Sequence, residues 1–156
     1  MTSTSTPAPG DARVVVGVDG SASSHRALEW AAFLAQTMGA RLQAVIAWQL
    51  PASYGPSVAE WNPEADMAVV LRDSIHTVFG AEPPVPVETS VQEGGAARVL
   101  LETAKGADLL VVGSRGHGGF AGLLLGSVSA SVAEHAPCPV LVVHGEQGPP
   151  ARAISG

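Results

Sequence analysis

Hydrophobic positions along the chain form short apolar runs that alternate with longer amphipathic stretches. The runs at 13–18, 41–48, 108–112 and 140–144 are nearly continuous, as in strands that are buried on both faces. A fifth run at 85–91 begins among prolines, which favours an edge strand. The stretches between the runs repeat apolar residues every three or four positions, as amphipathic helices do. Five strands alternating with four helices predict one α/β domain with a parallel sheet and right-handed crossovers.

Polar and glycine residues mark the predicted ends of the helices. Ser21 or Ser23 can cap the first helix, and Gly39 can end it. The fourth helix is predicted over 127–136, with Ser127 as its cap. From that position the Ser127 hydroxyl could also contact a phosphate oxygen or the water shell of a metal ion.

A loop dense in glycine follows the fourth predicted strand. Its glycines are Gly113, Gly116, Gly118, Gly119, Gly122 and Gly126. Glycine lets backbone N–H groups approach an anion, and a helix N-terminus presents unpaired N–H donors. A buried strand, a glycine loop and a helix start in this order therefore predict a phosphate site. A flexible linker is the alternative, but linkers rarely lie in register between a buried strand and a capped helix.

Two well-known phosphate loops do not fit this segment. The pattern G-x-x-x-x-G-K-[ST] is absent, because no lysine follows Lys105. A G-x-G-x-x-A match exists at Gly116, Gly118 and Ala121. That fingerprint belongs in the first strand–helix turn of a dinucleotide fold, whereas this loop follows the fourth strand. We therefore discard both interpretations.

The spacing Gly113-x2-Gly116-x9-Gly126-Ser127 resembles the universal stress protein family, whose ATP-binding members carry G-x2-G-x9-G-[ST]. Val-Val-Val-Gly-Val-Asp-Gly-Ser at 14–21 and Pro-Cys-Pro-Val-Leu-Val-Val at 137–143 resemble the family as well. The resemblance covers a nucleotide-binding domain at 13–144. Residues 1–12 and 145–156 are rich in Ser, Thr, Pro, Gly and Ala, and are predicted to be disordered tails.

The resemblance implies a strand order of 3-2-1-4-5, in which the first and fourth strands are neighbours where the order reverses. Ligands bind in the crevice at such a switch point. It also implies that Asp19 serves the ribose or holds Mg2+ through water, and that the backbone of Ala47 receives adenine. The implied nucleotide-binding residues are Gly17, Val18, Asp19, Ala47, Val112, Gly113, Ser114, Arg115, Gly116, His117, Gly118, Gly119, Gly126, Ser127, Val128 and Ser129.

Several of these residues also have plain structural interpretations. The alternative for Asp19 is a turn or capping residue, and the alternative for Gly17 and Val18 is that they are only core residues of the strand. Ala47 could simply pack, and a slip of one position would bring in Ile46 or Trp48 instead. Arg115 and His117 are the only side chains of the loop that can carry positive charge; either contacts phosphate or points to solvent.

A net charge of −6 argues against nucleic acid as a partner, since such partners need clustered Lys and Arg. Phosphate affinity must then come from local amides, the two loop cations or a divalent ion. No signal peptide and no apolar run of about 18 residues are apparent, so we expect a cytoplasmic protein without a membrane segment. The single cysteine, Cys138, is expected to be a small packed residue.

Three functions remain in competition. The first is an ATP-binding stress-response or regulatory module in which occupancy is the signal. The second is a slow nucleotide hydrolase or phosphotransferase, although no residue is identified as a base. The third is a dimeric interaction module without nucleotide. Relatives commonly dimerise through the last strand, so a homodimer through Val140, Leu141, Val142 and Val143 is expected. AMP or another adenine ligand remains an alternative, because the backbone amides of the loop do not distinguish ligands by their number of phosphates.

Overall fold

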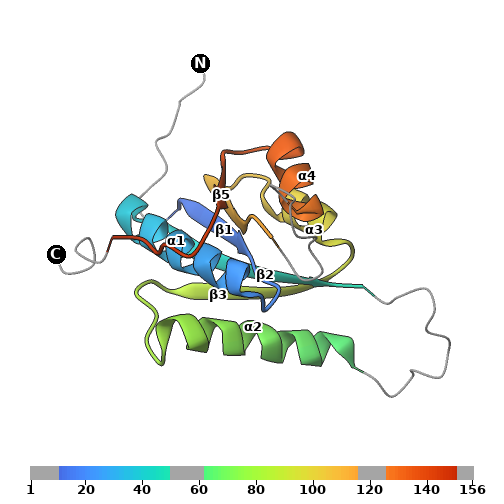
Figure 1. The fold of residues 1–156 in the computed structure, drawn as a ribbon, viewed down its shortest axis with the longest axis horizontal. Coiled ribbons are helices and arrows are strands. Elements are labelled where there is room, and N and C mark those ends of the chain that lie inside the picture. The colour runs from blue at the N-terminus through green and yellow to red at the C-terminus, as the bar shows by residue number, and fades with distance from the viewer. Residues whose placement is uncertain (1–10, 50–61, 116–125, 151–156) are drawn as a thin grey trace.

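A computed structural model describes residues 11–49, 62–115 and 126–150, which form a parallel five-stranded sheet with helices on both faces (Figure 1). The strand order is β3-β2-β1-β4-β5, so the predicted fold class and order are confirmed. The elements are β1 (Arg13–Gly17), α1 (Ala22–Met38), β2 (Arg41–Trp48), α2 (Pro63–Phe79), β3 (Val87–Glu93), α3 (Ala96–Thr103), β4 (Leu109–Gly113), α4 (Ser127–His135) and β5 (Val140–Val143).

The sheet divides the core into two layers because successive strand side chains point to opposite faces. Val14 and Val16 of β1 pack in one layer with α1 and α2. Val15, between them, packs in the other layer with α3 and α4. All three valines are fully buried, which explains why β1 is a continuous apolar run rather than an alternating one.

The helix and strand ends follow local chemistry. Ser21 caps α1 by accepting a hydrogen bond from the Ser24 N–H at 3.1 Å, and Gly39 ends this helix in the left-handed conformation with φ of 65°. The strand β3 begins at Val87, two residues later than predicted. Pro86 has no N–H to donate to a ladder, so pairing with β2 begins at the contact of Val87 with Leu42.

Arg13, at the start of β1, ties the amino end of the sheet to the end of α3. Its guanidinium donates to Gln43 Oε1 at 2.7 Å, to the Thr103 oxygen at 2.9 Å and to the Lys105 oxygen at 2.8 Å. Its backbone N–H donates to Asp108 Oδ2 at 2.8 Å. The last carbonyls of a helix have no partner within the helix, so Arg13 supplies donors that α3 cannot supply itself.

Beyond β5 the chain runs back across α1 (Figure 1). The structure describes residues 145–150 of the segment that was expected to be disordered, and Trp30 Nε1 donates to the Gln147 oxygen at 2.9 Å. Cys138, just before β5, is half-buried and packs against the layer with α3 and α4. Burial raises the pKa of its thiol, as expected of a packed cysteine rather than a thiolate. Among the described residues no helix is both long and apolar enough to cross a membrane.

We expect Arg13→Ala to lower the free energy of unfolding by about 1–3 kcal/mol, because it leaves the partly buried Thr103 carbonyl and Gln43 side-chain oxygen without their donor. Arg41→Ala is the matched control, since Arg41 only pairs with Glu88 on the surface at 2.9 Å and should cost at most about 1 kcal/mol. Urea unfolding of both variants measures the difference. Equal losses would contradict the role given to Arg13.

Candidate functional site

The carboxyl ends of β1 and β4 lie side by side at the point where the strand order reverses. Val14 pairs with Leu109 and Val16 with Val111. From there β2 and β3 extend the sheet on one side, and β5 extends it on the other. The chain leaves β1 toward one face of the sheet and leaves β4 toward the other. In open α/β sheets, ligands bind in the crevice that forms at such a point. The predicted residues of 17–19 and 112–115 lie at this crevice.

The turn after β1 is held by its own polar groups. Asp19 Oδ1 accepts from the Ser21 N–H at 2.9 Å, and the Asp19 N–H donates to Ser24 Oγ at 3.3 Å. The Asp19 carboxylate is therefore fixed in an Asx-type turn just after the carboxyl end of β1. Val18, one residue earlier, is buried and packs in the core layer of α1 and α2.

Gly17, at the carboxyl end of β1, lies close against α3. A Cβ on Gly17 would lie 3.0 Å from Leu100 Cδ1 and 3.2 Å from its Cδ2. The missing side chain at this position therefore lets Leu100 pack directly beneath β1. Helix–strand contact, rather than an unusual backbone angle, explains this glycine.

The register of β2 shows which neighbouring strand the backbone groups of Ala47 face. The Val45 oxygen accepts from the Val18 N–H at 2.8 Å, whereas the Trp48 oxygen accepts from the Gly94 N–H at 2.7 Å, after β3. In a parallel strand the N–H and C=O of one residue point to the same side, and successive residues alternate. The N–H and C=O of Ala47 therefore face the β1 side, just past the end of β1, while those of Ile46 and Trp48 face β3.

The two ends of the glycine loop are tied together at its base. The Ser114 oxygen accepts from the Gly126 N–H at 2.7 Å and from Ser129 Oγ at 3.1 Å. Ser129 Oγ also lies 3.1 Å from the Gly126 oxygen. The Ser114 N–H donates to the Val143 oxygen of β5 at 2.9 Å. Both Ser114 and Ser129 are buried, so their side chains belong to the base of the loop.

Helix α4 begins differently from the prediction. Its N-cap is Gly126 rather than Ser127, which is the first helical residue and is exposed. The first bond of this turn joins the Ala130 N–H to the Gly126 oxygen at 3.0 Å. No side chain of the described residues caps the helix. The N–H groups of residues 127–129, in the first turn before Ala130, therefore have no acceptor within the helix.

Gly113 and Arg115 contact a residue that the sequence did not single out for the site. A Cβ on Gly113 would lie 2.7 Å from the Ser23 oxygen and would also meet Ser23 Oγ and the Ser23 carbonyl carbon. Ser23 Oγ accepts from the Arg115 N–H at 3.2 Å. No local pattern separates Ser23 from Ser24, so only the tertiary structure identifies it. The Arg115 residue itself is exposed.

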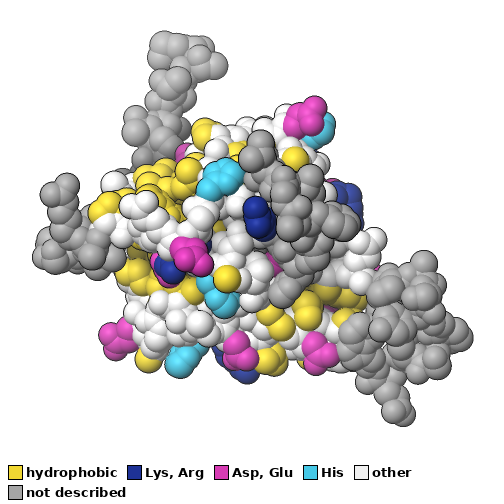
Figure 2. Space-filling model, viewed as in Figure 1, with side chains coloured by type: hydrophobic (Ala, Val, Ile, Leu, Met, Phe, Trp, Pro, Cys, Tyr) yellow, Lys and Arg dark blue, Asp and Glu magenta, His cyan; other side chains and the backbone are white. Residues whose placement is uncertain are grey.

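Four of the predicted site residues, 116–119, lie outside the described residues: Gly116, His117, Gly118 and Gly119. Val112 is buried and Val128 is half-buried, and both pack in the layer of α3 and α4. On the face in Figure 2 acidic and basic side chains are scattered rather than gathered in one patch. In the described part of the chain no group of three His, Cys, Asp or Glu is arranged for a metal ion.

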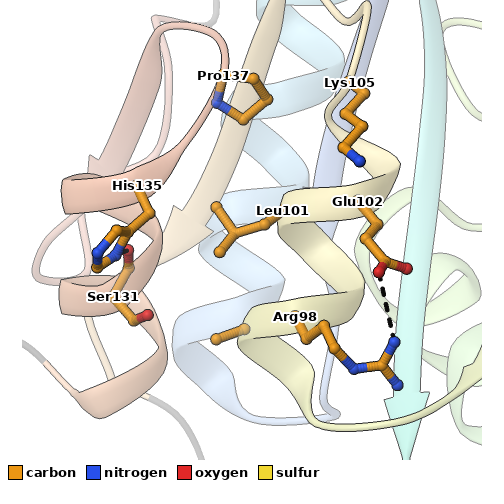
Figure 3. Close-up of a pocket in the computed structure, with 8 residues that line it drawn as sticks. Arg98, Leu101, Glu102, Lys105, Ser131, His135 and Pro137 are labelled. Atoms are coloured by element: carbon orange, nitrogen blue, oxygen red, sulfur yellow. Dashed lines mark hydrogen bonds and ion pairs between the residues drawn. The ribbon is translucent and has the colours of Figure 1, made fainter.

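A separate groove of about 460 Å³ lies between α3 and α4 (Figure 3). Leu101 projects toward α4, while Arg98 pairs with Glu102 along α3 at 3.5 Å. Ser131 and His135 line the groove from α4. The groove contains none of the predicted nucleotide-binding residues, and it extends to Lys105 and Pro137, near the amino ends of the strands.

Comparison with known proteins gives a consistent match. The model of the universal stress protein family matches residues 12–144. A universal stress protein of Mycolicibacterium smegmatis is 38% identical over 131 residues, which are 83% of this chain and 45% of that protein. The chain thus spans about half the length of the curated relatives it matches.

Two solved structures share the fold over most of their length. A universal stress protein from Lactobacillus plantarum is 25% identical with a TM-score of 0.71, and the match covers 86% of this chain and 98% of that one. A universal stress protein in complex with cAMP is 36% identical with a TM-score of 0.64, and the match covers 85% and 96% of the two chains.

We expect Gly113→Ala to lower the free energy of unfolding by about 1–3 kcal/mol, because its Cβ would collide with backbone atoms of Ser23 that cannot simply rotate away. Gly95→Ser is the matched control: a Cβ there meets only Gln49 Oε1 at 3.9 Å, and serine suits the N-cap of α3. Thermal or urea unfolding compares the two. If Gly113→Ala is as stable as the control, the contact between α1 and β4 is looser than described.

Proposed function

Because this chain belongs to the universal stress protein family, we propose that it is a cytoplasmic ATP-binding stress-response module in which nucleotide occupancy is the signal. The observation that carries the proposal is the set of backbone groups around the β1–β4 crevice. They are the N–H and C=O of Ala47 at one end and the first amides of α4 at the other. Such groups can bind the base and the phosphates of one ligand.

The phosphate end of this proposal rests on α4 and the loop before it. The amides at 127–129 and the positive end of the helix dipole favour an anion. With a net charge of −6 on the chain, these local donors must provide the attraction. Mg2+ would offset the charge of a triphosphate. Asp19, at the crevice mouth, is the carboxylate that would hold the ion through water.

The adenine end rests on the register of β2. Adenine presents an amino donor beside ring-nitrogen acceptors, which complements one backbone C=O and one N–H. Ala47 offers this pair past the end of β1, and its small side chain packs in the layer of α3 and α4. The solved relative in complex with cAMP, at 36% identity, supports an adenine nucleotide as the class of ligand.

We expect the purified protein, when denatured, to release ATP at a stoichiometry near one per chain, identified by chromatography and mass spectrometry. Calorimetry with Mg2+ and ATP, ADP, AMP, cAMP or adenosine then ranks the ligands. Release of ADP, with phosphate formed linearly in time, would favour a slow hydrolase instead. If nothing is released and no adenine ligand binds, the interaction module remains.

Ser127→Pro tests the phosphate end of the same prediction. Proline suits the first helical position, and Gly126 already has φ of −71° and ψ of 167°, which a following proline tolerates. The variant removes one amide and one hydroxyl donor, so we expect ATP affinity to fall tenfold or more while stability changes little. Ala96→Pro, at the first position of α3, is the matched control and should keep ATP affinity.

We further propose a homodimer formed through β5. This strand ends the sheet, and its residues Val140, Leu141 and Val142 are only half-buried in the single chain. An apolar edge with unpaired backbone groups is a site for strand pairing. We expect light scattering at micromolar concentration to give twice the chain mass, and Val142→Lys to shift the mass toward one chain. A monomeric wild type would refute the dimer but not the nucleotide site.

A further inference from the structure

One peptide unit at the start of the glycine loop is held from both sides. Its carbonyl, that of Ser114, accepts from the Gly126 N–H at 2.7 Å and from Ser129 Oγ at 3.1 Å, both at the start of α4. Its N–H, that of Arg115, donates to Ser23 Oγ in the first turn of α1 at 3.2 Å. This peptide therefore bridges the N-termini of two helices that lie on opposite faces of the sheet.

Ser23 is the member of this bridge that belongs to α1. The backbone of its turn already lies against β4, because Gly113 has no Cβ to keep it away. The same helix start fixes the Asp19 turn, because the Ser21 N–H donates to Asp19 Oδ1 and Ser24 Oγ accepts from the Asp19 N–H. The hydroxyl of Ser23 thus connects the turn that carries the Asp19 carboxylate to the segment that precedes the amides of α4.

We propose that Ser23 is a positioning residue for the phosphate part of the nucleotide, an inference that rests on the proposed function. Its hydroxyl orients the 114–115 peptide, whose carbonyl is bonded to Gly126 and Ser129, and so keeps the first amides of α4 in place relative to Asp19. Without this acceptor the exposed Arg115 is free to turn its N–H to solvent. The adenine end at Ala47 lies on β2, whose pairing does not involve Ser23.

The test compares Ser23→Ala with Ser23→Thr by calorimetry against Mg2+–ATP and against adenosine. We expect Ser23→Ala to weaken ATP binding about fivefold, the contribution of one neutral hydrogen bond, and to leave adenosine affinity unchanged. Ser23→Thr keeps the acceptor oxygen and should restore ATP affinity. Ser131→Ala, the same kind of change on α4 away from the loop, should affect neither ligand.

A second measurement does not depend on ligand. Amide hydrogen exchange of Arg115 in the free protein should be faster in Ser23→Ala than in the wild type, and thermal unfolding shows whether the variant remains folded. Unchanged ATP affinity in Ser23→Ala, or equal loss for ATP and adenosine, would overturn the positioning role while the proposed function stands. A wild type that binds neither ligand would overturn both.

Discussion

The contact of α1 with the end of β4 is the constraint on which the crevice depends. The helix can come this close only because Gly113 lacks a side chain where the Ser23 carbonyl passes. That approach brings the start of one helix next to the peptide that closes the glycine loop. It also sets how far the turn that carries Asp19 lies from the amides of α4. A wider spacing would leave the same residues in place around a looser crevice.

The chain combines an acidic net charge with a proposed site for the phosphates of a nucleotide. This is physically consistent because the donors belong to the backbone and to a helix start, and act over a few ångströms. Side chains near the proposed site mainly build its framework: those of Asp19 and Ser129 bond to backbone groups. In the proposed site, side chains thus support the framework and the main chain would contact the ligand.

Much of the fold was predictable from the sequence, because the periodicity of apolar residues reports burial directly. The runs around 13–18 and 41–48 became β1 and β2, and the family resemblance supplied the strand order. Contacts between distant segments were not predictable. The bond of Ser23 to Arg115 and the bond of Arg13 to Thr103 depend on how α1 and α3 pack against the sheet, which the local sequence does not encode. Ser127 was wrong as the cap because glycine serves this position well.

The two edge strands of the sheet differ in polarity, and this difference limits how chains can assemble. At one edge β3 carries Glu88, Thr89 and Gln92, and Glu88 is paired with Arg41. At the other edge β5 is apolar throughout. A two-fold pairing of β5 edges would turn both β3 edges outward, where polar side chains discourage further pairing. Such an assembly closes on itself, so it would yield a discrete pair in place of an open fibre.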